Sequence, residues 1–164
     1  GYDPKNIDEN QFIKLCVELD ITLTTSPLIR TERVAEMASL VAAVPVVRAA
    51  LLDLQRKFAA APPERNGAIL DGRDIGTVVL PDADIKFFLD ANINTRAERR
   101  TKELLQARQS VMFRDVLLDM QVRDRRDRCR SDSPLRPADD AIIVDTSTMD
   151  ADDVMTLALS HINA

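Results

Sequence analysis

Three short apolar segments, each followed by an aspartate, place the strongest constraint on the fold. Runs without polar alternation are typical of strands buried on both faces of a parallel sheet. Between the second and third runs, apolar periodicity predicts helices over about 94–108 and 111–128. Strands that alternate with helices predict an α/β fold, whose ligands gather at the carboxyl ends of the strands. The runs are Ala68–Leu70, Ile85–Leu89 and Ala141–Val144, and the aspartates are Asp71, Asp90 and Asp145.

Length and composition exclude several classes of protein. With 164 residues, 45% of them hydrophobic, the chain is long enough for one compact core. The net charge of −5 disfavours a protein that wraps nucleic acid. No apolar run reaches membrane-spanning length, and the two cysteines, Cys16 and Cys129, fit no CxxC spacing. We therefore expect a soluble cytoplasmic protein with no nucleic-acid or membrane partner.

The remaining elements follow from periodicity and from breaker residues. Phe12, Leu15, Cys16 and Leu19 form one stripe, which predicts a helix over 8–19. We expect a strand over 21–25, helices over 31–41 and from Pro45 towards Phe58, and a loop over 60–67. Thr148 is the expected N-cap of a last helix.

The stretch Asp71–Val79, with the sequence DGRDIGTVV, is the first candidate site. Glycine lets the backbone approach a ligand, and an arginine can hold a phosphate through paired hydrogen bonds. A neighbouring carboxylate can bind an amino group or hold Mg²⁺ through water. The alternative is a solvated turn with an internal Arg–Asp pair.

A second candidate is the run Arg123–Arg130, which holds five arginines in eight positions. On a helix Arg123, Arg126, Asp127 and Arg130 lie on one side, so their guanidinium groups converge and Asp127 partly compensates them. An exposed helix with Arg–Asp pairs is the alternative. A polyphosphate suits this cluster better than nucleic acid does, because the chain is acidic and no aromatic residues flank the run.

Other polar residues predict less when taken singly. Ser39 and Arg48 are separated by a helix break at Pro45, so only tertiary structure could bring them together. Alone they are interpreted as surface residues. His161 is interpreted as a packing or surface residue, and Cys129 as a buried or merely incidental thiol.

The stretch DGRDIGTVVLP at 71–81 and the arginine run at 123–130 form a specific combination. Together with Ile29–Glu32, Ala38–Arg48 and Lys86–Ala91 they resemble the bacterial cytidylate kinase family. The resemblance implies transfer of the γ-phosphoryl group of ATP to CMP or dCMP. It also implies a P-loop nucleoside-monophosphate-kinase fold, in which a parallel sheet is flanked by helices. Residues 1–66 would form the helical monophosphate-binding region, and residues 67–164 the core, with an arginine-rich lid at about 109–136.

The same resemblance implies roles for individual residues. Ser39, Arg48 and Asp74 would bind the cytosine base, whose mismatch would leave buried polar groups unpaired at about 1–3 kcal/mol each. Mg²⁺ would enter with ATP, no resident metal site is implied, and the protein would be a monomer. The implied catalytic residues are Arg73 and Arg130 at the transferring phosphoryl group, Arg123 in the lid, and Asp71 near the metal-bound phosphates. Arg123 and Asp127 would be lid residues that bind the nucleotide sugar and phosphates.

The chain departs from this family in two places. It contains no GxxxxGK[ST] phosphate loop and no Asp-Ser-Gly-x-x-Tyr-Arg segment. Between Thr25 and Ser26 the family carries a further strand and an acidic turn. We therefore expect a fragment that shows no kinase activity by itself. The alternatives are a non-catalytic nucleotide-binding or interaction domain, and a kinase for a different monophosphate.

Overall fold

The computed structural model describes residues 10, 13–15, 18, 26, 29, 31–41, 44–62, 67–129 and 133–163. The chain divides into two compact units, residues 1–70 and residues 71–164. The division into a monophosphate-binding region and a core at residue 66 stays a prediction.

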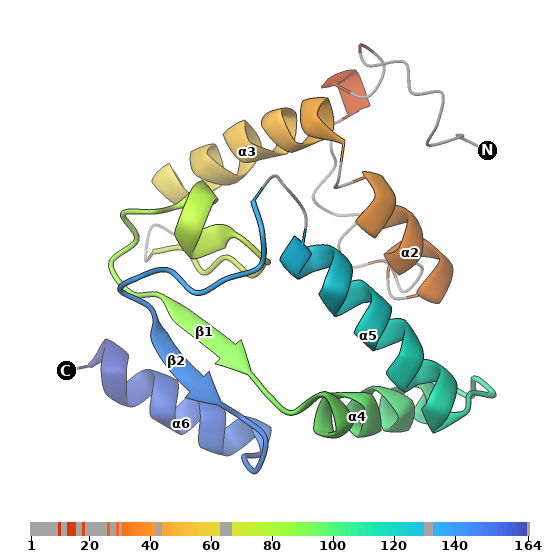
Figure 1. Ribbon diagram of the computed structural model, residues 1–164. Coiled ribbons are helices and arrows are strands. Elements are labelled where there is room, and N and C mark those ends of the chain that lie inside the picture. The colour runs from red at the N-terminus through yellow and green to blue at the C-terminus, as the bar shows by residue number, and fades with distance from the viewer. Residues whose placement is uncertain are drawn as a thin grey trace. The chain divides into compact units, whose positions relative to one another are not determined.

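Two helices dominate the described part of the first unit, α2 (Glu32–Val41) and α3 (Pro45–Ala60) (Figure 1). Both confirm the helices that periodicity predicts. Pro45 begins α3 because a proline at the first helical position has no N–H to leave unsatisfied. Of the predicted helix over 8–19, residues 10 and 13–15 are helical. The rest of it, and the whole predicted strand over 21–25, lie outside the described residues.

The strand predicted over Ala68–Leu70 is wrong. These residues are not part of a strand, and Ile69 is 94% exposed. An extended segment belongs to a sheet only when a neighbouring strand supplies backbone hydrogen bonds, and no described strand pairs with Ala68–Leu70. Asp71 therefore follows an exposed segment.

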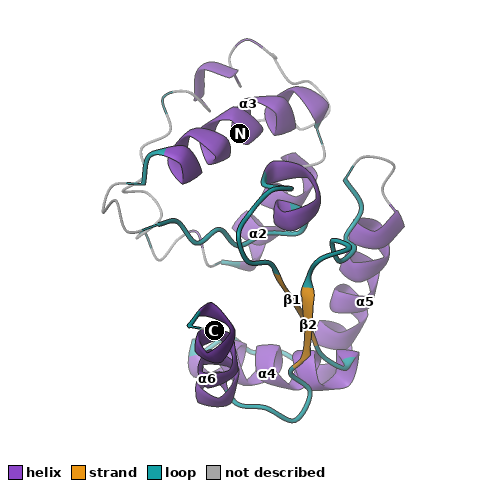
Figure 2. Ribbon diagram, turned by 90° about the vertical axis from the view of Figure 1, so that its left-hand side faces the viewer, coloured by secondary structure: helices purple, strands orange, loops and turns teal. Residues whose placement is uncertain are grey.

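The second unit is built on two parallel strands, β1 (Phe87–Asp90) and β2 (Ile142–Asp145) (Figure 2). Phe87 lies opposite Ile142, and Asp90 opposite Asp145. Parallel strands need a long crossover connection, which α4 (Ile93–Gln106) and α5 (Phe113–Cys129) provide. The predicted strands are confirmed with shifted ends, and both aspartates are the last strand residues.

Side chains from several elements form the core of the second unit. Ala97 and Leu104 of α4 are 0% and 2% exposed, and Val116 of α5 and Val144 of β2 are also buried. The last helix is α6 (Ala151–Ile162). It carries the exposed His161, whose ring meets the ring of Phe87 in β1 edge-on with centroids 6.1 Å apart. The contact and the exposure agree with the packing or surface role expected for His161.

The predicted N-cap of α6 is wrong. Asp150, not Thr148, caps the helix, and its side chain accepts a hydrogen bond from the Asp153 N–H at 2.9 Å. The Asp153 side chain accepts in return from the Asp150 N–H. This reciprocal capping box satisfies two N–H groups, which a threonine two residues earlier cannot reach. Among the described residues, no helix combines the length and the apolar character that a membrane crossing requires.

Candidate active site

The first candidate stretch, Asp71–Val79, includes a short helical segment. Residues Ile75–Val79 form a π-helical turn, η3, directly after Arg73 and Asp74. The N–H groups of Val78 and Val79 both donate to the Asp74 carbonyl oxygen, at 2.9 and 3.2 Å. A π-helical turn is rare and occurs often at functional sites. This turn fixes the backbone at Asp74 and, with it, the starting direction of the neighbouring Arg73.

Asp127 of α5 joins two arginines from distant parts of the second unit. Its Oδ2 atom lies 3.3 Å from Arg73 Nε and 4.0 Å from Arg123 Nε. The Asp127 side chain is 11% exposed, whereas the two arginine side chains are 49% exposed. One buried carboxylate thus orients two guanidinium groups that remain accessible to an anion. An arrangement with more cations than carboxylates favours phosphate binding.

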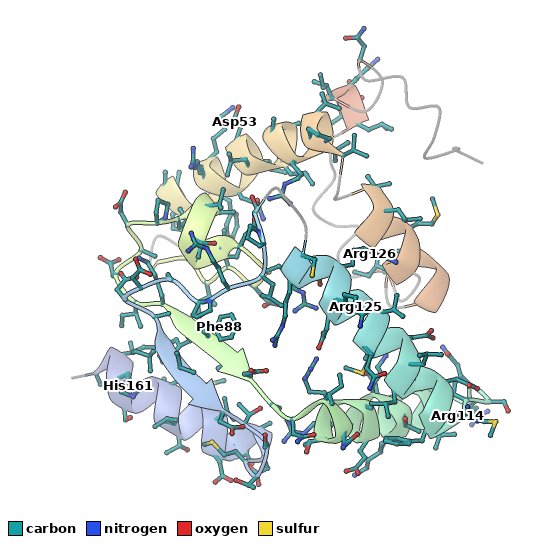
Figure 3. The ribbon with its side chains drawn as sticks, viewed as in Figure 1. Asp53, Phe88, Arg114, Arg125, Arg126 and His161 are labelled. Carbon is teal, nitrogen blue, oxygen red and sulfur yellow. The ribbon has the colours of Figure 1, made fainter. Side chains whose placement is uncertain are left out.

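The C-terminal end of α5 carries most of the positive charge. Arg123, Arg125, Arg126 and Arg128 are all exposed there. Figure 3 shows Arg125 and Arg126 near this end and Arg114 near the other. The helix also receives a backbone hydrogen bond from the Leu135 N–H to the Asp127 carbonyl oxygen at 2.8 Å, so the segment that follows the arginine run returns to it.

A cleft of about 360 Å³ lies at the carboxyl end of β1, between the first turn of α4 and the second half of α5. Arg96 and Asp124 meet in its wall with both carboxylate oxygens engaged, at 3.1 and 2.7 Å. The hydrogen bond from Arg96, and then the charges of Arg96, Arg128 and Arg73, hold the pKa of Asp124 below its usual value of 3.8. The residues that line the cleft are Asp90, Ala91, Ile93, Arg96, Gln121, Asp124 and Arg128.

The lowered pKa of Asp124 predicts a pH-dependent contribution to stability. A carboxyl whose pKa is lower in the folded state stabilises the fold above its unfolded-state pKa and loses that contribution as the pH falls through the folded value. We expect Asp124→Asn to lower the free energy of unfolding at about pH 6, and the difference from wild type to become smaller at about pH 2.5, as the Asp124 carboxyl takes up a proton. Urea unfolding at both pH values measures this. A difference at the lower pH as large as that at pH 6 would contradict the assignment.

The structure brings three of the predicted site residues together: Arg73, Arg123 and Asp127. Asp71 is exposed two residues before Arg73, and the Asp74 side chain is half-buried. Arg48 is half-buried on α3, and Ser39 lies on α2, but its side chain is outside the described set, as is all of Arg130. Ser39 and Arg48 belong to the first unit and Asp74 to the second. Their meeting at one base stays a prediction.

Sequence reasoning missed Arg96 and Lys86 as residues that support the site. Each interacts with a partner far along the chain, Arg96 with Asp124 and Lys86 with Asp140. The available signal was the position of Arg96 just beyond a predicted strand end, where polar side chains gather in an α/β fold. Cys129 is free and exposed, so the expectation of a buried thiol is wrong and that of an incidental thiol remains. Within the described residues, no three acidic, histidine or cysteine side chains gather as a metal site.

Comparison with known proteins gives a consistent result. The family model for cytidylate kinase matches residues 6–164. A cytidylate kinase of Paramagnetospirillum magneticum is 52% identical over 136 residues, which cover 83% of this chain and 64% of that protein. Cytidylate kinases of Rhodospirillum rubrum and Xanthobacter autotrophicus are 46% and 45% identical, over 97% and 96% of this chain and 74% of each relative. The chain thus spans about two thirds to three quarters of these relatives.

These matches place the chain in the class of the nucleoside monophosphate kinases, which share the P-loop α/β fold. The parallel strands and the arginine-bearing helix of the second unit agree with that class. Within the class, the chain belongs to the cytidylate kinase family. The resemblance drawn from the 71–81 and 123–130 segments is confirmed.

Proposed function

We propose that the protein transfers the γ-phosphoryl group of MgATP to CMP or dCMP, giving ADP and CDP or dCDP. The observation that carries this proposal, beyond family membership, is the buried Asp127 carboxylate that holds Arg73 and Arg123 while leaving both guanidinium groups half exposed. Phosphoryl transfer depends mainly on positioning and on charge neutralisation. Two oriented arginines whose guanidinium groups are accessible supply both the positioning and the charge neutralisation.

In this mechanism Arg73 and Arg123 bind phosphate oxygens and offset the negative charge that spreads over the transferred group. Asp127 keeps the two guanidinium groups oriented before the substrate arrives, so little reorganisation is needed. The arginine-rich end of α5, with Arg130, would act as the lid that excludes water during transfer. Asp71 would lie near the metal-bound phosphates.

Base selection is assigned to Ser39, Arg48 and Asp74. Their hydroxyl, guanidinium and carboxylate groups complement the carbonyl, ring nitrogen and amino group of cytosine. We further propose that the protein acts as a cytoplasmic monomer on free nucleotides. Nothing in the described residues or in the comparisons favours a non-catalytic binding domain.

The test is a coupled assay of ADP release by the full-length protein with MgATP and each of CMP, dCMP, UMP and AMP. We expect kcat/KM for CMP or dCMP to exceed that for AMP by at least about 100-fold, because a site built to hydrogen-bond one base leaves polar groups unpaired with another. Preference for AMP would reject the base-binding roles of Ser39, Arg48 and Asp74. No ADP release with any of the four would reject the proposed reaction.

A further inference from the structure

Arg96 connects the end of β1 to α5. Its Nε atom donates to the Ala91 carbonyl oxygen at 2.9 Å, one residue beyond the strand. Its two terminal nitrogens donate to the two carboxylate oxygens of Asp124 at 3.1 and 2.7 Å. The Arg96 and Asp124 side chains are each 26% exposed, so this ion pair is partly shielded from water. A paired, charge-assisted contact of this kind fixes geometry as well as distance.

Asp124 lies three residues before Asp127, so the two carboxylates are neighbours along one side of α5. Asp124 binds Arg96 at the strand end, and Asp127 binds Arg73 and Arg123. One turn of α5 thus contacts the end of β1 through Arg96, and the next turn contacts the arginines of the candidate active site. A rotation of this part of α5 would move both carboxylates together.

The second half of α5 has little apolar attachment to the core. Between Gln121 and Cys129, Val122 is 51% exposed, and Asp127, at 8%, is the buried residue. Val116, the buried apolar residue of α5, lies about three turns before Asp127. Polar contacts therefore fix the rotation of residues 121–129, and Arg96–Asp124 is the paired contact among them.

We infer that Arg96 is a positioning residue: through Asp124 it sets the rotation of the second half of α5, and so places Asp127, Arg73 and Arg123 for phosphate binding. Arg96 itself is not a substrate ligand in this assignment. The catalytic part of the inference rests on the proposed function, whereas the structural part concerns α5 alone.

The test compares Arg96→Lys, Asp124→Asn and the double variant in the full-length protein. Lysine keeps the charge of Arg96 but cannot reproduce its three-way fork. We expect each single variant to raise KM for CMP about 10-fold, because a small misplacement of binding groups is costly. We expect KM for MgATP to stay within about twofold, and the double variant to be no worse than either single one. A merely destabilised protein would lose active fraction, and therefore kcat, with both KM values unchanged.

The matched control is Arg100→Lys, one turn further along α4, where Arg100, 30% exposed, pairs at 2.9 Å with the exposed Glu103 of the same helix. It should leave both KM values within about twofold, as expected for a surface pair. The inference would be overturned if the effects of Arg96→Lys and Asp124→Asn on KM for CMP added up in the double variant. An unchanged KM for CMP in the single variants would overturn it as well.

Amide hydrogen exchange decides the structural part without any activity measurement. Residues 121–129 should exchange about 10-fold faster in Arg96→Lys than in wild type, while residues 113–120 should not change. Equal exchange in the variant, wild type and Arg100→Lys would also overturn the inference. A wild-type protein that does not phosphorylate CMP would instead reject the proposed function, and the exchange result would still decide whether Arg96 holds α5.

Discussion

Replacing Arg73 by alanine in the full-length protein is expected to lower kcat/KM for CMP by about 100- to 1,000-fold, the usual loss when one oriented charge-stabilising donor is removed. Arg73 is held by the buried Asp127 at 3.3 Å yet is half exposed, so its guanidinium group can reach a phosphate. The change would also leave Asp127 with Arg123 at 4.0 Å as its described ion-pair partner. Steady-state kinetics with CMP and MgATP measures the effect.

Two further variants serve as controls for Arg73→Ala. Arg125→Ala removes an exposed arginine of the same helix that takes part in none of the ion pairs described above, and it should change kcat/KM by less than about threefold. Arg73→Lys keeps the charge without the planar fork, so it should fall between wild type and Arg73→Ala. A loss in Arg73→Ala no larger than that in Arg125→Ala would show that Arg73 lies outside the active site.

Helices and strands with strong periodicity were predictable from the sequence. The helix expected over 31–41 is observed over Glu32–Val41, and α3 begins at the expected Pro45. Both predictions depend on local signals. For α2 the signal is an apolar stripe, and for α3 it is a proline, which fits a helix only in its first turn. The strands β1 and β2 were also predicted. Their apolar runs are too long for a turn, and polar residues bound each run.

The errors have physical causes that local patterns do not contain. Ala68–Leu70 is as apolar as a strand but has no described partner, so its chemistry alone could not decide its conformation. Thr148 and Asp150 are both good N-caps, and the choice depended on Asp153 being placed to complete the reciprocal pair. The π-helical turn at Ile75–Val79 leaves no periodic signal, since it is only five residues long.

The candidate site was predictable only as a set of residues. Arg73 and Asp127 are far apart in sequence, and no spacing rule predicts that they meet; the family resemblance proposed them, and the fold brings them to 3.3 Å. Arg96 and Asp124 are 28 residues apart and carry no motif of their own. Contacts of this kind are set by how α4 packs on α5, which depends on buried residues such as Ala97 and Val116.

The second large effect is expected at Lys86, which anchors the segment that follows Arg73. Its side chain is 8% exposed, and its ammonium group donates to the Pro81 carbonyl oxygen and to Asp140 Oδ2, the latter at 2.6 Å. Its aliphatic stem packs against Gly76, where an added Cβ would lie 3.2 Å from Lys86 Cδ. One buried lysine thus ties both ends of residues 76–81 to the strand that begins at Phe87.

Lys86→Ala is expected to lower the free energy of unfolding by about 2–3 kcal/mol, from lost packing and from a Pro81 carbonyl left without its donor. Lys86→Met keeps most of the stem and should lose about half as much. Urea unfolding followed by circular dichroism measures both, with Lys102→Ala, an exposed lysine of α4, as the control that should change stability by less than about 0.5 kcal/mol. If Lys86→Ala unfolded at the same urea concentration as Lys102→Ala, the anchoring role would be wrong.

Because the anchored segment continues directly from Arg73 and Asp74, folded Lys86→Met should also bind CMP more weakly, whereas Lys102→Ala should not.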